Sequence, residues 1–219
     1  MRREGLGEFI AFLVTIFMLT LVAIEAFDRK YFYSPGTAIA CMFLASIPII
    51  FRHYRLIIFP LWMAIWFFTL LWLHSFGILH DYYGRIYWFD ELTHTMAIGL
   101  IACVIFLLLI LINKHARSIR MPPLTYPFFI IIFAMGLGVT WEVLEFILDV
   151  TLDTPMQYSL TDSVTDMMTD LGGGLMASSA CLVYLLYLDP DQISEALQAD
   201  RLIDRFQRKY HQWELPGQE

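Results

Sequence analysis

The sequence predicts an all-α, polytopic membrane helix bundle with about six transmembrane helices and a C-terminal amphipathic helix. Hydrophobic residues make up 58% of the 219 residues and charged residues only 16%, whereas soluble domains average about 45–50% and about 25%. The apolar residues form long uncharged runs, and a run of about 18 or more is typical of a bilayer-spanning helix. From residue 189 onward, charged and apolar residues are instead mixed, as in an amphipathic helix.

Six apolar runs are expected to cross the membrane, separated by polar or proline-containing connections. The first follows a basic N-terminus, as in a signal peptide, but it is too long for one and is interpreted as a retained span. Aromatic clusters at 31–33 and 82–88 fit membrane–water interfaces. The predicted spans are 8–27, 36–51, 56–80, 92–112, 124–148 and 164–188.

A second region, 189–219, is expected to follow the six-span domain of residues 1–188. Asp189-Pro190 is typical of a helix start, because proline fits the first helical position. We expect the helix to lie on the membrane surface or to bind a protein partner; packing of the tail on the cytoplasmic loops is an equal alternative. Its predicted apolar face contains Ile193, Leu197, Leu202, Phe206, Tyr210 and Trp213.

The basic residues predict the orientation of the chain. With six spans, Arg29, Lys30 and Arg85 fall on one side, and the other eleven of the 14 Lys and Arg residues fall on the opposite side. Basic residues favour cytoplasmic loops. We therefore expect a protein of the cell (inner) membrane with both termini in the cytoplasm, in contact with membrane lipids.

Two kinds of site are not expected. Cys41, Cys103 and Cys181 lie in different apolar runs, without the Cys/His spacing of a zinc site, and are interpreted as small buried hydrophobic residues. No basic stripe with interleaved aromatic residues occurs, so nucleic acid is not an expected partner.

Acidic residues of three spans converge on the predicted outer side. They are Asp90 and Glu91 with His94 at the start of the fourth span, Glu142 and Glu145 near the end of the fifth, and Asp162, Asp166 and Asp170 at the start of the sixth. Residues three or four apart share one face of a helix. An ionisable group at membrane depth costs about 2.5–3.5 kcal/mol on insertion scales and normally faces a bundle interior. The convergence therefore predicts a site between these three spans.

A bound cation is the expected occupant of this site. Neighbouring carboxylates repel one another, and either protonation or a cation relieves the repulsion. Oxygen ligands suit Mg²⁺, Mn²⁺ or Ca²⁺, and a histidine adds Zn²⁺ or iron. We expect a divalent metal cation, with Glu145 or Asp170 as the catalytic base. The expected metal ligands are Asp90, His94, Glu142, Asp162 and Asp166.

Plainer interpretations stay open for parts of this pattern. Asp90 and Asp162 are each placed to be the N-cap of a helix. The run Gly172-Gly173-Gly174 is most simply a close helix–helix contact, and it could also loosen the helix beside a site. His74 and His80, toward the outer end of the third span, could add to the site.

Three segments resemble the YjdF-type family of multi-pass membrane proteins: Asp90–His94 with the later Gly99, Trp141–Phe146, and Asp162–Met167 with the later Gly172-Gly173. More remotely, they resemble VanZ-like proteins, which share an acidic-x-x-x-His element, a later helix Glu and a late Asp-rich helix ahead of glycine. The resemblance covers about 80–187. It implies a six-span or similar membrane fold with a metal or lipid connection, and VanZ-like members are associated with cell-envelope antibiotic tolerance. Glu91 departs from the family pattern, in which a basic residue often follows the first aspartate.

Four functions are compatible with the sequence. The first is a metal-dependent enzyme acting on a lipid or headgroup. The second is an accessory or structural subunit of a membrane complex. The third is a cation or proton transporter, which is disfavoured because no inverted repeat is evident and the cytoplasmic halves of the spans look uniformly apolar. The fourth is a di-iron carboxylate oxidoreductase, for which Glu91-x-x-His94 supplies one motif where two are needed.

Overall fold

The computed structural model describes residues 3–28, 33–115, 121–154, 156–157, 159–187 and 190–197. All regular secondary structure of these residues is helical, and six of their helices are long and apolar enough to cross a membrane. These are α1 (Arg3–Asp28), α2 (Tyr33–His53), α3 (Leu61–His80), α5 (Phe89–His115), α6 (Thr125–Leu152) and α7 (Leu160–Tyr187). Two short helices, α4 (Tyr82–Arg85) and α8 (Pro190–Leu197), complete the set. The predicted all-α bundle with six spanning helices is confirmed.

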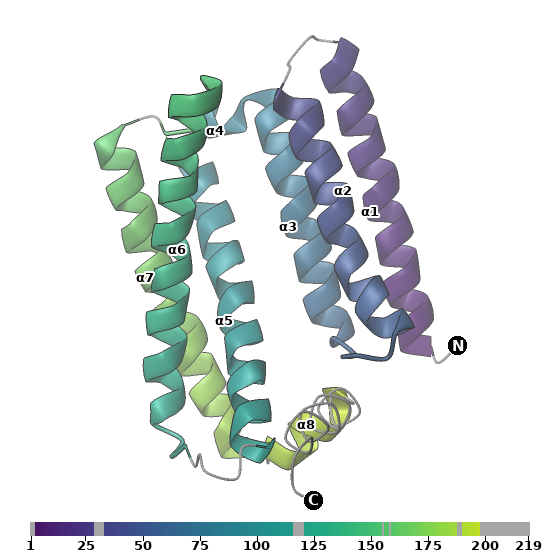
Figure 1. The fold of residues 1–219 in the computed structure, drawn as a ribbon, viewed down its shortest axis with the longest axis vertical. Helices are drawn as coiled ribbons and strands as arrows, with labels where there is room; N and C mark the ends of the chain where they lie inside the picture. The colour runs from purple at the N-terminus through teal and green to yellow at the C-terminus, as the bar shows by residue number, and fades with distance from the viewer. Residues whose placement is uncertain are drawn as a thin grey trace, which may run out of the picture.

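The six long helices form two groups of three. Figure 1 shows α1, α2 and α3 on one side and α5, α6 and α7 on the other, with α3 packed against α5. Successive long helices run in opposite directions. The start of α5, the end of α6 and the start of α7 therefore meet at one end of the molecule, at the top of Figure 1. We call this end the site end.

The predicted start of the third span, residue 56, is earlier in the chain than the start of the helix in the structure. The helix begins at Leu61 rather than at residue 56, and residues 57–60 have no regular structure. Pro60 explains the difference, because proline lacks a backbone N–H and disfavours helical conformation in the residue before it. The short helix α4 was not predicted, since its residues were interpreted only as an aromatic interface cluster.

The described part of the C-terminal region packs on the bundle itself, at the end opposite the site end. Its helix α8 begins at Pro190, as expected. Ile193 and Leu197 are buried in a hydrophobic cluster with residues of α5, α6 and α7. The backbone N–H of Ile58 donates to the carbonyl of Leu197 at 2.9 Å. Residues 198–219, where most of the predicted amphipathic helix falls, lie outside the described residues.

A buried ion pair joins α1 to α2, also opposite the site end. The Glu8 carboxylate is 1% exposed and pairs with the Arg52 guanidinium. Burial of a charge in an apolar bundle is costly unless the charge is paired. The prediction that the halves of the spans remote from the site are uniformly apolar is therefore wrong at Glu8.

Two glycines let α7 approach its neighbours closely. A Cβ atom on Gly173 would lie 3.6 Å from the Cα of Thr95 in α5, and one on Gly174 would lie 3.8 Å from the Cβ of Ala134 in α6. A Cβ atom on Gly172 would meet nothing within 4 Å. Helix α7 continues through all three glycines. The predicted helix–helix contact is thus confirmed at Gly173 and Gly174, as expected for small residues in membrane bundles.

Candidate functional site

The site lies between α5, α6 and α7, where successive helix turns form layers. Gly174 approaches Ala134 and Ile98, and one turn nearer the site end, Asp170 contacts Gly138 and His94. Residues four apart share a helix face. The layers are an apolar layer of Ile98, Ala134 and Gly174, a middle layer of His94, Gly138 and Asp170, and an upper layer of Asp90, Glu142 and Asp166.

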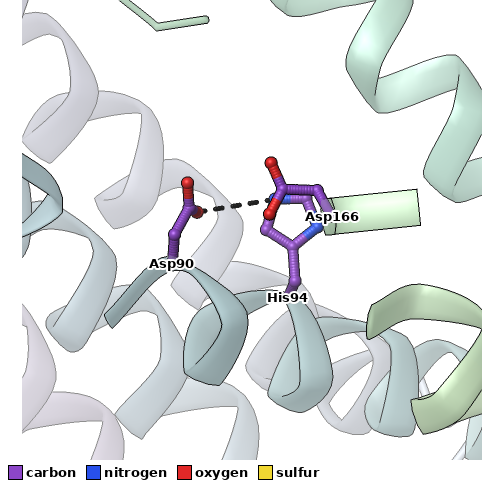
Figure 2. A group of neighbouring side chains, drawn as sticks. All are labelled: Asp90, His94 and Asp166. Carbon is purple, nitrogen blue, oxygen red and sulfur yellow. Dashed lines mark ion pairs between the residues drawn. The ribbon is translucent and has the colours of Figure 1, made fainter. Parts of the chain in front are cut away.

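Three of the five predicted metal ligands form one compact group. Asp90, His94 and Asp166 each offer a ligand atom, and these atoms all lie within 4.8 Å of one another. Figure 2 shows Asp90 and His94 side by side on one helix, with Asp166 entering from another. The His94 Nε2 atom lies 3.6 Å from Asp90 Oδ1. Asp166 is only 3% exposed, so the group is largely inside the bundle.

The buried carboxylate of Asp170 orients His94. Its Oδ1 lies 3.1 Å from the Nδ1 atom of His94, and the Asp170 side chain is 1% exposed. A carboxylate only accepts hydrogen bonds, so Nδ1 donates. In the neutral imidazole, Nε2 then carries the lone pair, and this nitrogen lies near Asp90. Histidines that bind metals usually have their second nitrogen held in this way by a carboxylate or carbonyl.

Gly138 makes room for Asp170. A Cβ atom on Gly138 would overlap Oδ2 of Asp170 and would lie 3.0 Å from its Cγ. The absence of a side chain at this position of α6 therefore allows the carboxylate to sit between the helices. Asp170 Oδ2 is buried and has no hydrogen-bond partner among the described residues.

The other two predicted ligands lie beside the compact group rather than in it. Glu142 is 6% exposed, and its Oε1 has no hydrogen-bond partner in the described part of the chain. Asp162 is half-buried. Both lie close enough to Asp90 and Asp166 to interact with them electrostatically.

The predicted catalytic bases occupy different positions. Asp170 lies behind His94, in the middle layer. Glu145 lies on α6 near the site end, where its Oε1 accepts a hydrogen bond of 2.9 Å from the Trp141 indole N–H. Glu145 also interacts electrostatically with Glu142, His94 and Asp90.

Neither N-cap interpretation holds. Helix α7 begins at Leu160, and the Ser159 hydroxyl oxygen accepts a hydrogen bond of 3.1 Å from the backbone N–H of Asp162. Ser159 is thus the capping side chain, and Asp162 lies within the first turn. Asp90 follows Phe89, the first residue of α5, so it also lies inside its helix.

A hydrogen-bonded chain that the sequence did not reveal adjoins the site. The Thr93 hydroxyl donates to the Asp90 carbonyl at 3.0 Å, and the Tyr83 hydroxyl donates to Thr93 Oγ1 at 3.3 Å. His74 Nδ1 lies 2.7 Å from the Tyr83 hydroxyl. Burial raises the pKa of the Tyr83 phenol above its ordinary value, so this hydroxyl stays protonated. Because the chain ends on a carbonyl, which only accepts, the His74 Nδ1 must donate and its Nε2 carries the lone pair.

His74 and His80 therefore differ in role. The imidazole of His74 joins the chain beside the site, whereas that of His80 stacks on Tyr82, with ring centroids 5.7 Å apart. Tyr83 sits in an aromatic connection that sequence reasoning assigned only to the membrane interface, so nothing in its spacing marked it as a neighbour of Asp90.

Described residues of the connection between α6 and α7 are hydrogen-bonded to α6 beside the site. Asp149 accepts hydrogen bonds from the backbone N–H groups of Met156 and Gln157 and from the Thr154 hydroxyl. The side-chain amide of Gln157 then donates to the Glu142 carbonyl at 3.0 Å. Asp149 thus holds the backbone of Met156 and Gln157, and Gln157 contacts Glu142.

The site is rich in carboxyl groups and poor in basic partners. No Lys or Arg within the described ranges forms an ion pair with Asp90, Asp166 or Asp170. Arg85, the basic residue nearest in sequence to Asp90, pairs instead with Asp81 at 3.2 Å. Positive charge for the cluster must therefore come from protons or from a cation.

Comparison with protein families gives a match over most of the chain. A family model described as "Predicted membrane protein (DUF2238)" matches residues 8–187. No curated protein and no solved structure matches the chain. The match includes all six spanning helices, whereas the resemblance to YjdF-type proteins was seen only from about residue 80 onward. That narrower resemblance and the relation to VanZ-like proteins stay predictions.

Replacement of Gly138 by alanine tests the fit of Asp170 between the helices. We expect Gly138→Ala to displace the Asp170 carboxylate and to lower the melting temperature in detergent, measured by intrinsic fluorescence. Gly136→Ala is the matched control, because a Cβ atom there meets nothing within 4 Å. This control should be neutral or stabilising by up to about 1 kcal/mol, since alanine favours helix more than glycine does. Equal melting temperatures for the two variants would contradict the tight fit.

Proposed function

The chain belongs to the family described as "Predicted membrane protein (DUF2238)", and from this premise we propose that it is a metal-dependent membrane enzyme. In this proposal a divalent cation binds between α5, α6 and α7 and acts on a lipid or a lipid headgroup. The observation that carries the proposal is the compact group of Asp90, His94 and Asp166, whose imidazole is oriented by the buried Asp170.

The donor atoms favour a transition metal. Catalytic zinc sites use three protein ligands, among them histidine with or without a carboxylate, and keep a further position open. Calcium instead takes about six to eight oxygen ligands. One imidazole nitrogen and two carboxylates, with Glu142 Oε1 nearby, resemble the first pattern more closely. We therefore propose Zn²⁺ or Mn²⁺ ahead of Mg²⁺ and Ca²⁺.

The proposed roles of the remaining acids follow from their positions. Asp170 holds His94, which suits an orienting residue better than a base. Glu145 lies beside the group and is held by Trp141, so it is the better candidate for the general base. Since no Arg or Lys pairs with the described cluster carboxylates Asp90, Asp166 and Asp170, the metal would supply the positive charge that a phosphate-bearing headgroup requires.

The layer beneath the site argues against transport. Ile98, Ala134 and Gly174 pack together one turn below the His94–Asp170 hydrogen bond. A conduction path needs polar groups along the depth of the membrane. The accessory-subunit alternative makes no such demand, and it is distinguished from the enzyme by the activity experiment below.

Metal titration of the purified protein is the primary test. We expect wild-type protein, stripped with a chelator, to bind Zn²⁺ or Mn²⁺ in calorimetry. At a metal concentration of about 100 Kd the fold should gain about 2.7 kcal/mol. Asp166→Ala should abolish binding, and Asp170→Asn should weaken it by about 10–100-fold, because loss of a ligand's orienting partner has that effect.

Asp153→Asn is the matched control for these variants. Asp153 is an exposed carboxylate that ends α6 in left-handed conformation, which asparagine also tolerates. Its affinity for the metal should equal that of wild type. If wild-type protein binds no metal above the background of Asp166→Ala, the metal proposal is wrong.

The enzymatic part of the proposal is tested with lipid vesicles. Metal-loaded protein should release or modify headgroups in vesicles of mixed zwitterionic and anionic phospholipids, detected by mass spectrometry. Glu145→Gln should retain the metal but lose about 100-fold or more of the rate, within the range for loss of a general base. Metal binding without lipid turnover, together with capture of a stable protein partner in mild detergent, would favour the accessory-subunit alternative.

We further propose that both termini are cytoplasmic in a cell (inner) membrane and that the site end faces outward. Cysteines introduced at Tyr87, which is 88% exposed near the site end, and at Tyr54, which is 62% exposed at the opposite end, test this orientation. A membrane-impermeant maleimide should label Tyr87→Cys in intact cells and Tyr54→Cys only after permeabilisation. The reverse pattern would overturn the orientation.

A further inference from the structure

The short helix α4 places the Tyr83 side chain between α3 and α5 at the site end (Figure 1). Asp81, in left-handed conformation, joins the end of α3 to α4. The Tyr83 ring packs edge-on against the rings of His74 from α3 and Phe89 from α5, with centroids 5.8 Å and 5.0 Å away. A Cβ atom on Gly77 would lie 2.9 Å from the Tyr83 ring. The absence of a side chain at Gly77 therefore makes room for this ring.

Two hydrogen bonds hold the Tyr83 hydroxyl in this position. The hydroxyl oxygen lies 2.7 Å from His74 Nδ1, and the hydroxyl donates to Thr93 Oγ1 at 3.3 Å. Thr93 is 5% exposed, and its own hydroxyl donates to the Asp90 carbonyl at 3.0 Å. Because the Tyr83 hydroxyl is a donor in one bond and an acceptor in the other, its removal would break both links at once.

These contacts hold the turn of α5 that carries two of the proposed metal ligands. Asp90 and His94 lie four residues apart on the face of α5 that meets α7. Thr93 lies on a neighbouring face, about 100° around the helix. Asp170 of α7 holds the first face, and Tyr83 of α4 holds the second. Helix α5 is therefore fixed from two sides at the level of these ligands.

The His74 ring also reaches the third helix of the site. It packs edge-on against the Trp141 ring of α6, with centroids 6.4 Å apart. Trp141 in turn donates the 2.9 Å hydrogen bond to Glu145, the proposed general base. One side chain of α3 thus contacts both the residue that holds α5 and the residue that holds Glu145. Helix α3, which supplies none of the proposed ligands, supports the site from outside.

We propose that Tyr83 and His74 are positioning residues, which hold Asp90 and His94 where they can bind a metal together with Asp166. In this proposal neither residue touches the metal, and both act through Thr93 and the backbone of α5. The inference rests on the proposed function for the use of this geometry. The geometry itself is measurable in protein without metal, so the two proposals can fail separately.

NMR of the histidine imidazoles tests the positioning on the metal-free full chain in detergent micelles. The six histidines are labelled with ¹⁵N, and the His94 signals are identified by their absence from His94→Gln. We expect Tyr83→Phe to shift the ring-nitrogen signals of both His74 and His94, although the hydroxyl reaches His94 only through Thr93 and the backbone. Unchanged His94 signals in Tyr83→Phe would overturn the proposal.

Tyr82→Phe is the matched control. The Tyr82 ring belongs to the same aromatic cluster, against His80 and Phe89, but the hydrogen-bonded chain to α5 runs through Tyr83. Tyr82→Phe should therefore leave the His94 signals unchanged.

Replacement of Thr93 tests the same chain from α5, so that misfolding of one variant does not decide the result. Thr93→Val keeps the shape of the side chain without its hydroxyl and should reproduce the His94 shift of Tyr83→Phe. Thr93→Ser keeps the hydroxyl and should resemble wild type. A His94 shift of equal size in the two variants would contradict a role for the hydroxyl chain.

Metal titration connects the positioning to the proposed function. Tyr83→Phe should bind Zn²⁺ or Mn²⁺ about 10-fold more weakly than wild type, the lower end of the effect of losing an outer partner of a metal ligand. Tyr82→Phe should bind like wild type. His74→Asn, which keeps an N–H donor near the position of Nδ1, should bind more tightly than His74→Leu.

The outcomes separate the two proposals. If wild type binds metal and Tyr83→Phe binds it equally well, the positioning proposal is wrong and the proposed function stands. If Tyr83→Phe shifts the His94 signals but wild type binds no metal, the proposed function is wrong, and the hold of Tyr83 on His94 is still confirmed.

Discussion

The hydrogen bond between His94 and Asp170 is the interaction on which the architecture of the site depends. It joins α5 to α7 over 3.1 Å in a setting from which water is largely excluded. It forms only because Gly138 leaves room for the carboxylate and Gly173 lets α7 lie against α5. By fixing the tautomer of the neutral His94 imidazole, it also leaves the lone pair on Nε2, the nitrogen near Asp90. One buried bond thus sets helix spacing and ligand chemistry together.

The constraint that follows is electrostatic. Asp90 and Asp166 converge on His94 with no Lys or Arg partner among the described residues. Buried oxygens of Glu142 and Asp170 lack hydrogen-bond partners in the same part of the molecule. Buried polar atoms are rarely left in this state, because an unsatisfied group costs about 1–3 kcal/mol, and more when it is charged. A bound cation or shared protons would satisfy these atoms, and a cation would do so without removing their charge.

Sequence patterns predicted the six spans and the convergence of acids, because both depend on local periodicity and on counting of turns. Asp90 and His94 are four apart on one helix, and Asp166 was placed at their level by topology alone. Finer relations depended on side-chain geometry. The hydrogen bonds of Asp170 to His94 and of Tyr83 to Thr93 depend on how closely the helices approach. The sequence does not contain that distance. Pro60 could have predicted that α3 begins only at Leu61. The prediction placed the start at residue 56 because the apolar run continues through Pro60.

Buried carboxylates have different partners in the two halves of the molecule. In the α1–α3 half, Glu8 is almost fully buried and is paired directly with Arg52. This arrangement is self-contained, because one positive charge balances one negative charge, and it needs nothing from outside the chain. In the α5–α7 half, Asp166 and Asp170 are buried to a similar extent. Among the described residues, His94 is the one partner with a positive form that they share.

A purely structural role would be served better by a direct ion pair such as that of Glu8 with Arg52, which this chain does form. The arrangement in the α5–α7 half leaves Asp166 and Asp170 without a Lys or Arg partner among the described residues. For this reason the unbalanced cluster, rather than the balanced pair, is the part of the structure in which function is to be sought.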